Sequence, residues 1–446
     1  MYLPLVPILA TRPREHGLRR QLTAGQMTMV AVGGSIGTGL LLGSAAAIGV
    51  AGPAVILTFV LAAFINWTVT QALSELASVH PAAGSFRVYG ELYLNEWAGF
   101  LSSAGYWAAI AISIGTELVA SATYMAFWFP AVPGIVWVFV ASVLLVGVNL
   151  RSVGEYGRFE YWFAMIKVVV IAAFIVLGAG LMIAGTTPPQ YVAHGGFFPR
   201  GALAALLALP FALYTFAGVE FVAVTSGESR SADEVARAGR LTFLTLTLVY
   251  MGAIIVLTGV IPWDRTGVSE SPFVTVFRTI RIPAAGHIMN FAVLTAALSG
   301  ANAALYSASR TLFSLARSGW APPAMGELNR AGSPTNALLV SSFAIVLALV
   351  LERWAPQQAF VSILNAALFG LLLSWLVSLA AHVQMRRLAG KSAVGSAIGL
   401  TLIVASILKT WWDSPLSFYS GIVYLIVLNA VYFLLRKSHR ARTIEP

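Results

Sequence analysis

Long apolar stretches alternate with short polar or Pro- and Gly-marked turns along almost the whole chain. Twelve of these stretches approach the ~20 residues that a helix needs to cross a bilayer. Their approximate bounds are 24–50, 53–74, 98–126, 133–150, 159–184, 203–226, 240–261, 286–316, 335–352, 359–384, 393–412 and 416–435. The pattern predicts an all-α membrane protein with twelve transmembrane helices, between a cytoplasmic N-terminal segment at 1–23 and a cytoplasmic C-terminal tail at 436–446.

The basic side chains fall mainly on one side of the membrane when these segments are threaded through it. With the N-terminus inside, twenty of the 27 Lys and Arg residues are cytoplasmic, six are outside, and Lys167 stays within a segment. This asymmetry follows the positive-inside rule. Adding or deleting one span would move every later loop to the wrong side, so the charges predict an even number of spans with both termini cytoplasmic.

Composition agrees with a protein whose solvent is the lipid bilayer of the cell membrane. The 446 residues are 58% hydrophobic and 10% charged, with a mean hydropathy of +0.82, whereas soluble domains average about 25% charged residues. The net charge of +10 is explained by topology, so no nucleic acid partner is expected. The chain has no cysteine and no HExxH or phosphate-loop motif, which argues against an enzyme, a metal site or an ATP-driven pump.

Glycine interrupts the first apolar segment. Gly33 to Gly43 reads GGSIGTGLLLG, with five glycines in eleven residues. Each interior glycine costs a helix roughly 1 kcal/mol against alanine, and unwound backbone is tolerated at membrane depth only where protein or a cavity surrounds it. Close helix packing is the alternative use of small residues, but the density here favours a ligand site.

A second interruption is predicted in the sixth segment, which reads LPFALYTFAGVEFVAVTSGE. Gly-interrupted spans in corresponding positions of two halves indicate an inverted-repeat transporter with a site near the midplane. The two interrupted segments are five apart. We therefore expect two five-helix repeats over 24–384, followed by two additional helices over 385–435.

The two breaks together suit a zwitterion, because one offers free N–H groups and the other free C=O groups. The substrate carboxylate is expected on the backbone of the first break, and the ammonium on the carbonyls of the second. The predicted substrate-binding residues are Ser35, Ile36, Gly37, Thr38, Gly39, Phe216, Ala217, Gly218 and Glu220. The ring of Phe216 either closes over substrate as a gate or serves simple packing.

Three ionisable residues lie at mid-membrane depth and are candidates for proton coupling: Lys167, Glu117 and Glu220. Lys167 lies about 14 Å along its helix from Arg158, too deep to reach water easily. A permanently charged structural lysine paired with a carboxylate is the alternative, and Glu220 also has a structural interpretation. Glu228 and Arg230 form either a cytoplasmic gate or a solvated pair.

Weaker candidates have polar or amphipathic side chains at depths that suit a cavity: Trp107, Ser113, Ser299, Asn302 and Asn365. Each is also typical of an interhelical hydrogen bond. The outer loop from Pro262 to Pro283 contains the apolar stretch PFVTVF, which is either a short interfacial helix or part of a plain connector.

Several of these stretches resemble the amino acid permease family of the amino acid/polyamine/organocation superfamily. The resemblance rests on GGSIGTGL at 33–40 with AGP at 51–53, FAGVE at 216–220 with SGE at 226–228, SASRTLFSLARSGWAPP at 307–323, and FEYWFAMIKVVVIAAFIVLG at 159–178. It implies a LeuT-like fold, a 5+5 inverted repeat with discontinuous helices 1 and 6. It also implies that Lys167 touches the carbonyls of the broken first helix, as a built-in replacement for a sodium ion.

The resemblance implies a secondary active transporter that imports amino acids across the cell membrane, with protons as the coupling ion and no other cofactor. Without a clear cluster of charged cavity residues, a neutral amino acid is the expected substrate. Proton symport with alternating access is the first hypothesis. An obligate amino acid exchanger and a non-transporting amino acid sensor are the alternatives, and the oligomeric state is left open.

Overall fold

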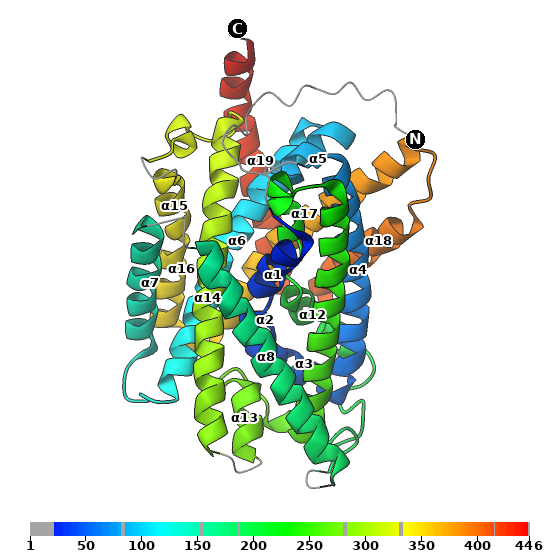
Figure 1. The fold of residues 1–446 in the computed structure, drawn as a ribbon, viewed down its shortest axis with the longest axis vertical. Coiled ribbons are helices and arrows are strands. Elements are labelled where there is room, and N and C mark those ends of the chain that lie inside the picture. The colour runs from blue at the N-terminus through cyan, green and yellow to red at the C-terminus, as the bar shows by residue number, and fades with distance from the viewer. Residues whose placement is uncertain are drawn as a thin grey trace.

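The computed structural model describes residues 22–81, 85–151, 156–185, 188–279, 283–329, 333–413 and 415–444. Within these ranges the chain is all-helical, and the helices form a bundle whose long members run along its longest dimension (Figure 1). The β structure in these ranges is an isolated parallel bridge between Leu22 and Ser229, and the remaining residues form turns and connections.

Helices lie over every one of the twelve predicted segments. Nine segments are continuous: α4 (Val55–Val79), α6 (Glu96–Ala126), α7 (Gly134–Arg151), α8 (Tyr156–Ile183), α12 (Ala232–Val260), α14 (Pro283–Arg317), α17 (Pro356–Leu388), α18 (Val394–Asp413) and α19 (Pro415–Ile444). Three are broken: α1 (Ala24–Ser35), α2 (Thr38–Leu41) and α3 (Gly43–Ala51) in the first, α9 (Ala204–Leu207), α10 (Leu209–Thr215) and α11 (Phe221–Val224) in the sixth, and α15 (Thr335–Ser342) and α16 (Ala344–Trp354) in the ninth.

The remaining elements are short. They are the α-helices α5 (Ser85–Tyr93) and α13 (Pro272–Thr279) and the 3₁₀ turns η1 (Gly52–Ala54), η2 (Thr225–Glu228), η3 (Trp263–Arg265) and η4 (Pro323–Gly326). Helix α13 decides between the two interpretations of the outer loop in favour of a helix. Its Phe273, Val276 and Phe277 are buried, and it packs against α12 and α14.

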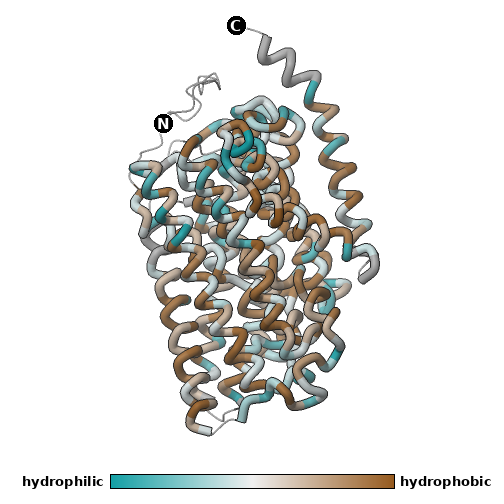
Figure 2. The backbone as a smooth tube through the Cα atoms, turned by 90° about the vertical axis from the view of Figure 1, so that its right-hand side faces the viewer, coloured by the Kyte–Doolittle hydropathy of each residue, from teal (hydrophilic) through white to brown (hydrophobic). Residues whose placement is uncertain are grey.

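Length and hydropathy make this a multi-pass membrane protein. Eight helical stretches among the described residues are long and apolar enough to cross a membrane, and two shorter apolar helices cover Gly134–Leu150 and Val394–Lys409. Figure 2 shows hydrophobic residues along much of the length of the long helices. On α8, for example, Val169 and Val176 are 57% and 72% exposed, as expected for side chains that face lipid.

Two differences from the sequence prediction concern helix ends and helix α5. The predicted segment 240–261 corresponds to α12, which begins at Ala232, because the side chain of Ser231 caps it and Asp233 and Glu234 occupy its first turn. Helix α5 was not predicted, since its nine residues are too few and too polar for a span. It packs on α6 through Gly90 and Gly99, where an added Cβ at Gly90 would lie 2.6 Å from the Cα of Gly99.

The centre of the bundle is α6, which packs against both α14 and α17. Helix α1 packs against α8 and α12, and α10 packs against α2, α3 and α4. These contacts hold the broken first and sixth segments inside the bundle, surrounded by continuous helices. The interruptions are therefore enclosed by protein, the condition under which membrane-depth backbone can leave the helical conformation.

Candidate functional site

The first helix is interrupted at Ile36 and Gly37, inside the glycine-rich stretch that predicted a break. Helix α1 ends at Ser35, Gly37 takes an extended conformation with φ −132° and ψ −154°, and α2 begins at Thr38. A second turn at Leu42 separates α2 from α3. The break leaves several backbone groups without the partners that a continuous helix would supply.

Side chains from four different parts of the fold satisfy the carbonyl groups around this break. Lys167 Nζ donates to Gly33 O at 2.8 Å, and Tyr250 Oη donates to Ser35 O at 2.8 Å. Further along, Thr215 Oγ1 donates to Gly39 O at 3.0 Å and Ser271 Oγ donates to Leu41 O at 2.8 Å. Because an unsatisfied backbone group in hydrocarbon costs several kcal/mol, these four bonds stabilise the interruption.

One of the N–H groups freed at the break belongs to Thr38, and its partner is Glu117 from the middle of α6. Both carboxylate oxygens accept this hydrogen bond, at 3.2 Å and 3.3 Å. The carboxylate also lies against Gly37 and Gly300, where an added Cβ would come within 2.5 Å and 2.8 Å of Glu117 side-chain atoms. Glycine at both positions therefore makes room for the carboxylate of Glu117.

The sixth segment is interrupted between Thr215 and Phe221, where the second break was predicted. Gly218 has a φ of +106°, which L side chains rarely adopt. The Oε2 atom of Glu220 accepts the Gly218 N–H at 3.0 Å, and its Oε1 atom is buried without a hydrogen-bond partner among the described residues. A Cβ at Gly218 would lie 2.8 Å from the Cα of Ser35, so the two breaks lie against each other.

A cavity of about 50 Å³ lies where the two breaks meet. Its lining comes from both breaks and from α6, α14 and α17: Gly34, Ser35, Gly37, Gly39, Ala109, Ile110, Ser113, Glu117, Tyr214, Ala217, Gly218, Phe221, Gly300, Ala304, Ala367 and Leu371. About 10–15 Å³ of such space is enough for one water molecule, so the cavity has room for a few waters. It is called the central chamber below.

The cavity contains most, but not all, of the predicted binding residues. Ser35, Gly37, Gly39, Ala217 and Gly218 line it. Ile36 and Thr38 are not among its lining residues, although the N–H of Thr38 bonds the lining carboxylate of Glu117. The side chain of Glu220 turns back on its own break. The ring of Phe216 packs between Phe59 and Tyr250, with centroid separations of 6.4 Å and 5.0 Å, which matches the packing interpretation.

Of the five weaker cavity candidates, one lines the cavity. Ser113 does so, with its hydroxyl bonded to Ile110 O at 2.8 Å. Asn302 accepts a hydrogen bond from Asn149 Nδ2 at 2.6 Å and joins α14 to α7, which is the interhelical hydrogen bond given as its alternative. Ser299 is buried and Asn365 is half-buried, and neither lines the cavity.

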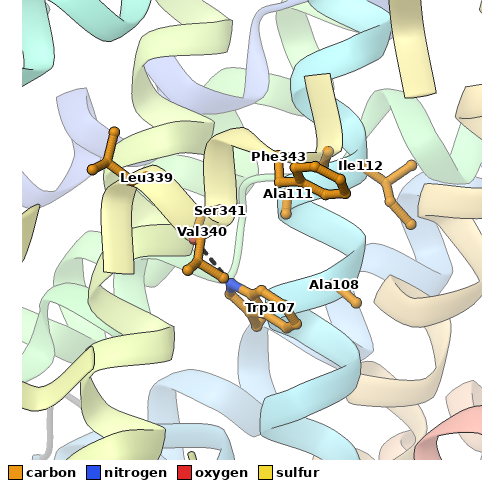
Figure 3. A pocket seen from close by; sticks show the side chains of 9 residues that line it. Trp107, Ala108, Ala111, Ile112, Leu339, Val340, Ser341 and Phe343 are labelled. Atoms are coloured by element: carbon orange, nitrogen blue, oxygen red, sulfur yellow. Dashed lines mark hydrogen bonds between the residues drawn. The ribbon is translucent and has the colours of Figure 1, made fainter. Parts of the chain in front are cut away.

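Trp107 also forms the interhelical hydrogen bond given as its alternative, and its ring faces a different space from the chamber. Its Nε1 donates to Ser341 Oγ at 3.0 Å, across to the point where the ninth segment breaks at Phe343. Figure 3 shows this indole beside Val340 and Ser341 in a wide lateral groove of about 510 Å³. Phe343 is 75% exposed, so the groove lies on the outer side of the bundle. It is separate from the chamber between the breaks of the first and sixth segments.

Replacing Trp107 by alanine should leave substrate affinity and uptake per folded molecule within about twofold of the unsubstituted protein, because its indole faces the lateral groove and does not line the chamber. The matched contrast is Ala109→Trp, two residues along α6, which fills the central cavity. That variant should lose uptake. The measurement is initial uptake of radiolabelled substrate in proteoliposomes. If Trp107→Ala lost as much uptake as Ala109→Trp, Trp107 would belong to the substrate site after all.

The predicted gate pair lies partly outside the described residues. The side chain of Glu228 is among those not described, and the side chain of Arg230 is exposed. The backbone N–H of Arg230 donates to Leu22 O at 3.1 Å, and the carboxylate of Glu234 accepts the N–H of Ala24. The chain before α1 is thus tied to the connection between the sixth and seventh segments.

Fold and site together define a multi-pass helical membrane protein with a buried chamber between two helix interruptions. The profile of the amino acid permease family matches residues 26–394. The chain therefore belongs to the amino acid permease family. It is a family of transport proteins and not of enzymes, in agreement with the absence of catalytic motifs from the sequence.

Curated relatives agree over most of the chain. An amino acid permease of Bacillus subtilis, YtnA, is 36% identical over 84% of this chain and 82% of its own length. The aromatic amino acid transport protein AroP of Escherichia coli K12 is 33% identical over 96% of this chain and 98% of its own. The gamma-aminobutyric acid permease of Bacillus subtilis is 34% identical over 84% and 81%.

A solved structure has a similar fold. The crystal structure of the Eremococcus coleocola manganese transporter, in complex with an aromatic bis-isothiourea substituted compound, matches with a TM-score of 0.58 over 94% of each chain. The sequence identity is 14%, so this likeness concerns the fold alone.

Proposed function

We propose that this protein imports amino acids across the cell membrane by proton symport with alternating access. The observation that carries the proposal is the meeting of two helix interruptions, from segments five apart in the chain, around one buried chamber. Twelve spans arranged as a 5+5 inverted repeat of LeuT-like fold plus two helices, with both termini cytoplasmic, complete the proposed architecture. Membership of the amino acid permease family supports it.

The substrate's charged ends fit the two breaks. The first intrahelical bond of α2 runs from Leu41 N to Gly37 O, so the N–H groups of Thr38, Gly39 and Leu40 precede it and point towards the break. These groups suit the carboxylate. The carbonyl groups at the end of α10, near Phe216 and Ala217, suit the ammonium.

The chamber's walls favour a substrate with an uncharged side chain. Apart from Glu117 the lining side chains are apolar, hydroxyl-bearing or absent, with Ala109, Ile110, Ala304, Ala367 and Leu371 among them. Glu117 is the one acidic or basic residue among the described lining residues, and its carboxylate already bonds the Thr38 N–H. A charged substrate side chain would therefore have to compete for it or stay buried unpaired, at a cost of several kcal/mol. The named relatives include a carrier of aromatic amino acids and one of gamma-aminobutyric acid, which is compatible with an uncharged side chain here.

Proton coupling is assigned to the ionisable groups around the chamber, Lys167, Glu117 and Glu220. All three are buried. Lys167 bonds a carbonyl just before the first break, and the two carboxylates each accept an N–H at a break. A change of charge on any of them alters the stability of an interruption, which links proton binding to the shape of the substrate chamber.

The test is uptake into proteoliposomes that contain no amino acid. The purified protein should accumulate a neutral amino acid when the outside is acidic, and a protonophore should abolish the accumulation. Selection of the substrate comes from a thermal-shift screen of the twenty amino acids. Uptake that requires preloading and ignores the pH gradient would establish an exchanger instead, and binding without flux under every gradient would establish a sensor.

A further inference from the structure

The carboxylate of Glu117 occupies the chamber at the group expected to hold the substrate. It accepts the Thr38 N–H through both oxygens, and it forms part of the chamber wall. Glu117 is 8% exposed and comes from α6, far along the chain from the first break. A carboxylate of the protein therefore makes the contact that a substrate carboxylate requires.

We propose that Glu117 is a built-in stand-in for the substrate carboxylate, which binds the first break when no amino acid is present and must leave when one arrives. This inference rests on the proposed function of the chamber. It adds a role for this side chain: stabilising the closed carrier without substrate.

The residues around the Glu117 carboxylate leave room for it, which indicates that its contact with the first break is a specific feature of the fold. Gly37 and Gly300 come from two different helical segments, and both lack the Cβ that would reach the Glu117 carboxylate. The side chain of Thr38 is fully buried beside the same carboxylate. Glu117 therefore faces both the N–H and the hydroxyl of Thr38, as a substrate carboxylate would.

Charge gives the reason that Glu117 and substrate cannot share the position. Two carboxylates on one N–H group repel each other strongly in a low-dielectric interior. The neighbouring cation is Lys167, whose ammonium bonds Gly33 O at 2.8 Å. Entry of the substrate carboxylate therefore requires Glu117 to turn away from Thr38 or to take up a proton.

The stand-in has a consequence for the transport cycle. Net uptake requires the carrier to return to its outward-facing state without substrate. During this return the chamber must be stable while it is empty. With Glu117 on Thr38 the break is satisfied in that closed form. Exchange, by contrast, returns with substrate bound, so it depends less on Glu117.

The experiment measures binding and two kinds of flux in Glu117→Ala and Glu117→Gln, with equal pH on both sides so that no proton gradient contributes. We expect Glu117→Ala to bind the neutral substrate about tenfold more tightly, because the substrate no longer displaces a charged hydrogen bond. The ratio of net downhill uptake to exchange should fall by about tenfold, because the substrate-free carrier loses the charged hydrogen bond that stabilises its return. Glu117→Gln, which retains an acceptor oxygen, should change both quantities less.

Acetate is the direct probe of the vacated position. Equilibrated on both sides, it should raise the net uptake of Glu117→Ala towards that of the unsubstituted protein and compete with substrate binding. Neither effect is expected in the unsubstituted protein. Glu352→Gln, a half-buried carboxylate on α16 that does not line the chamber, is the matched control and should change neither the affinity nor the flux ratio.

A glycine variant tests the same idea without touching the carboxylate. Gly300→Ala places a Cβ 2.8 Å from the Glu117 carboxyl carbon, so it should displace the carboxylate and lower the flux ratio as Glu117→Ala does. Gly147→Ala, where nothing lies within 4 Å, is its control.

Weaker binding in Glu117→Ala, or an equal loss of net uptake and exchange without acetate rescue, would overturn the stand-in role. Those results leave the proposed function intact, because substrate still binds and moves. Absence of binding and exchange in the unsubstituted protein would instead remove the proposed function itself.

Discussion

Replacing Lys167 by alanine should abolish uptake driven by a pH gradient, with a loss of at least about tenfold, while substrate affinity stays within about threefold. The tenfold loss of uptake corresponds to the free energy of one hydrogen bond from a charged group, about 1.5–3 kcal/mol. The small change in affinity is expected because Lys167 bonds Gly33 O and does not line the chamber. Uptake in proteoliposomes and equilibrium binding of the same radiolabelled amino acid measure the two effects.

The physical reason lies in what the ammonium does at the first break. Lys167 is 4% exposed, so its charge is stabilised mainly by local partners and not by water. Its bond to Gly33 O helps to hold the end of α1 against α8. When the proton leaves, this bond weakens, and the end of α1 is freer to move relative to α8.

The control for this prediction is Lys391→Ala, an exposed lysine just after α17. It removes the same charge from the surface and should leave uptake unchanged. Lys167→Arg keeps a cation that does not release its proton, so we expect binding without gradient-driven accumulation. Normal accumulation by Lys167→Ala would refute the coupling role of this residue.

The sequence was most informative where glycine and hydropathy act together. Five glycines within Gly33–Gly43 predicted an interruption, and the helix breaks at Ile36 and Gly37. The FAGVE stretch predicted the second break, where Gly218 takes a positive φ. These positions were predictable because a local backbone requirement leaves a local trace in the residue types.

The partners of the broken backbone left no such trace. Tyr250 bonds Ser35 O and Ser271 bonds Leu41 O, but a tyrosine or serine in a membrane protein has many uses. Gly300 was not singled out, although its lack of a side chain makes room for Glu117. Contacts between segments that are more than a hundred residues apart depend on how helices rotate in the bundle, and hydropathy does not fix that rotation.

The depth of a polar residue in the membrane did not predict which space its side chain faces. Trp107, Ser113 and Asn302 all lie at depths that suit a cavity, yet only Ser113 faces the chamber. Asn302 pairs with Asn149, and Trp107 pairs with Ser341 at the lateral groove. A polar side chain in lipid seeks any partner within reach, so polarity identifies inward-facing positions without naming what they face.

Substituting alanine at Gly218 adds one methyl group, and we expect it to disrupt the chamber strongly. The residue has a φ of +106°, and the new Cβ would lie 2.5 Å from Ser35 Oγ and 2.8 Å from both Ser35 Cα and Ser35 N. A strained φ costs about 1–3 kcal/mol, and two of the three colliding atoms belong to backbone, which cannot rotate away. The two breaks must then separate.

We expect Gly218→Ala to lower substrate affinity by roughly a hundredfold, the equivalent of about 2.8 kcal/mol, and to abolish uptake and exchange together. Gly196→Ala separates strain from collision, because Gly196 also has a positive φ of +85° but nothing lies within 4 Å of an added Cβ. It should lower thermal stability without changing affinity. If Gly218→Ala bound substrate as well as Gly196→Ala does, contact between the two interruptions would not be required for the site, and the ammonium and carboxylate would have to be held elsewhere.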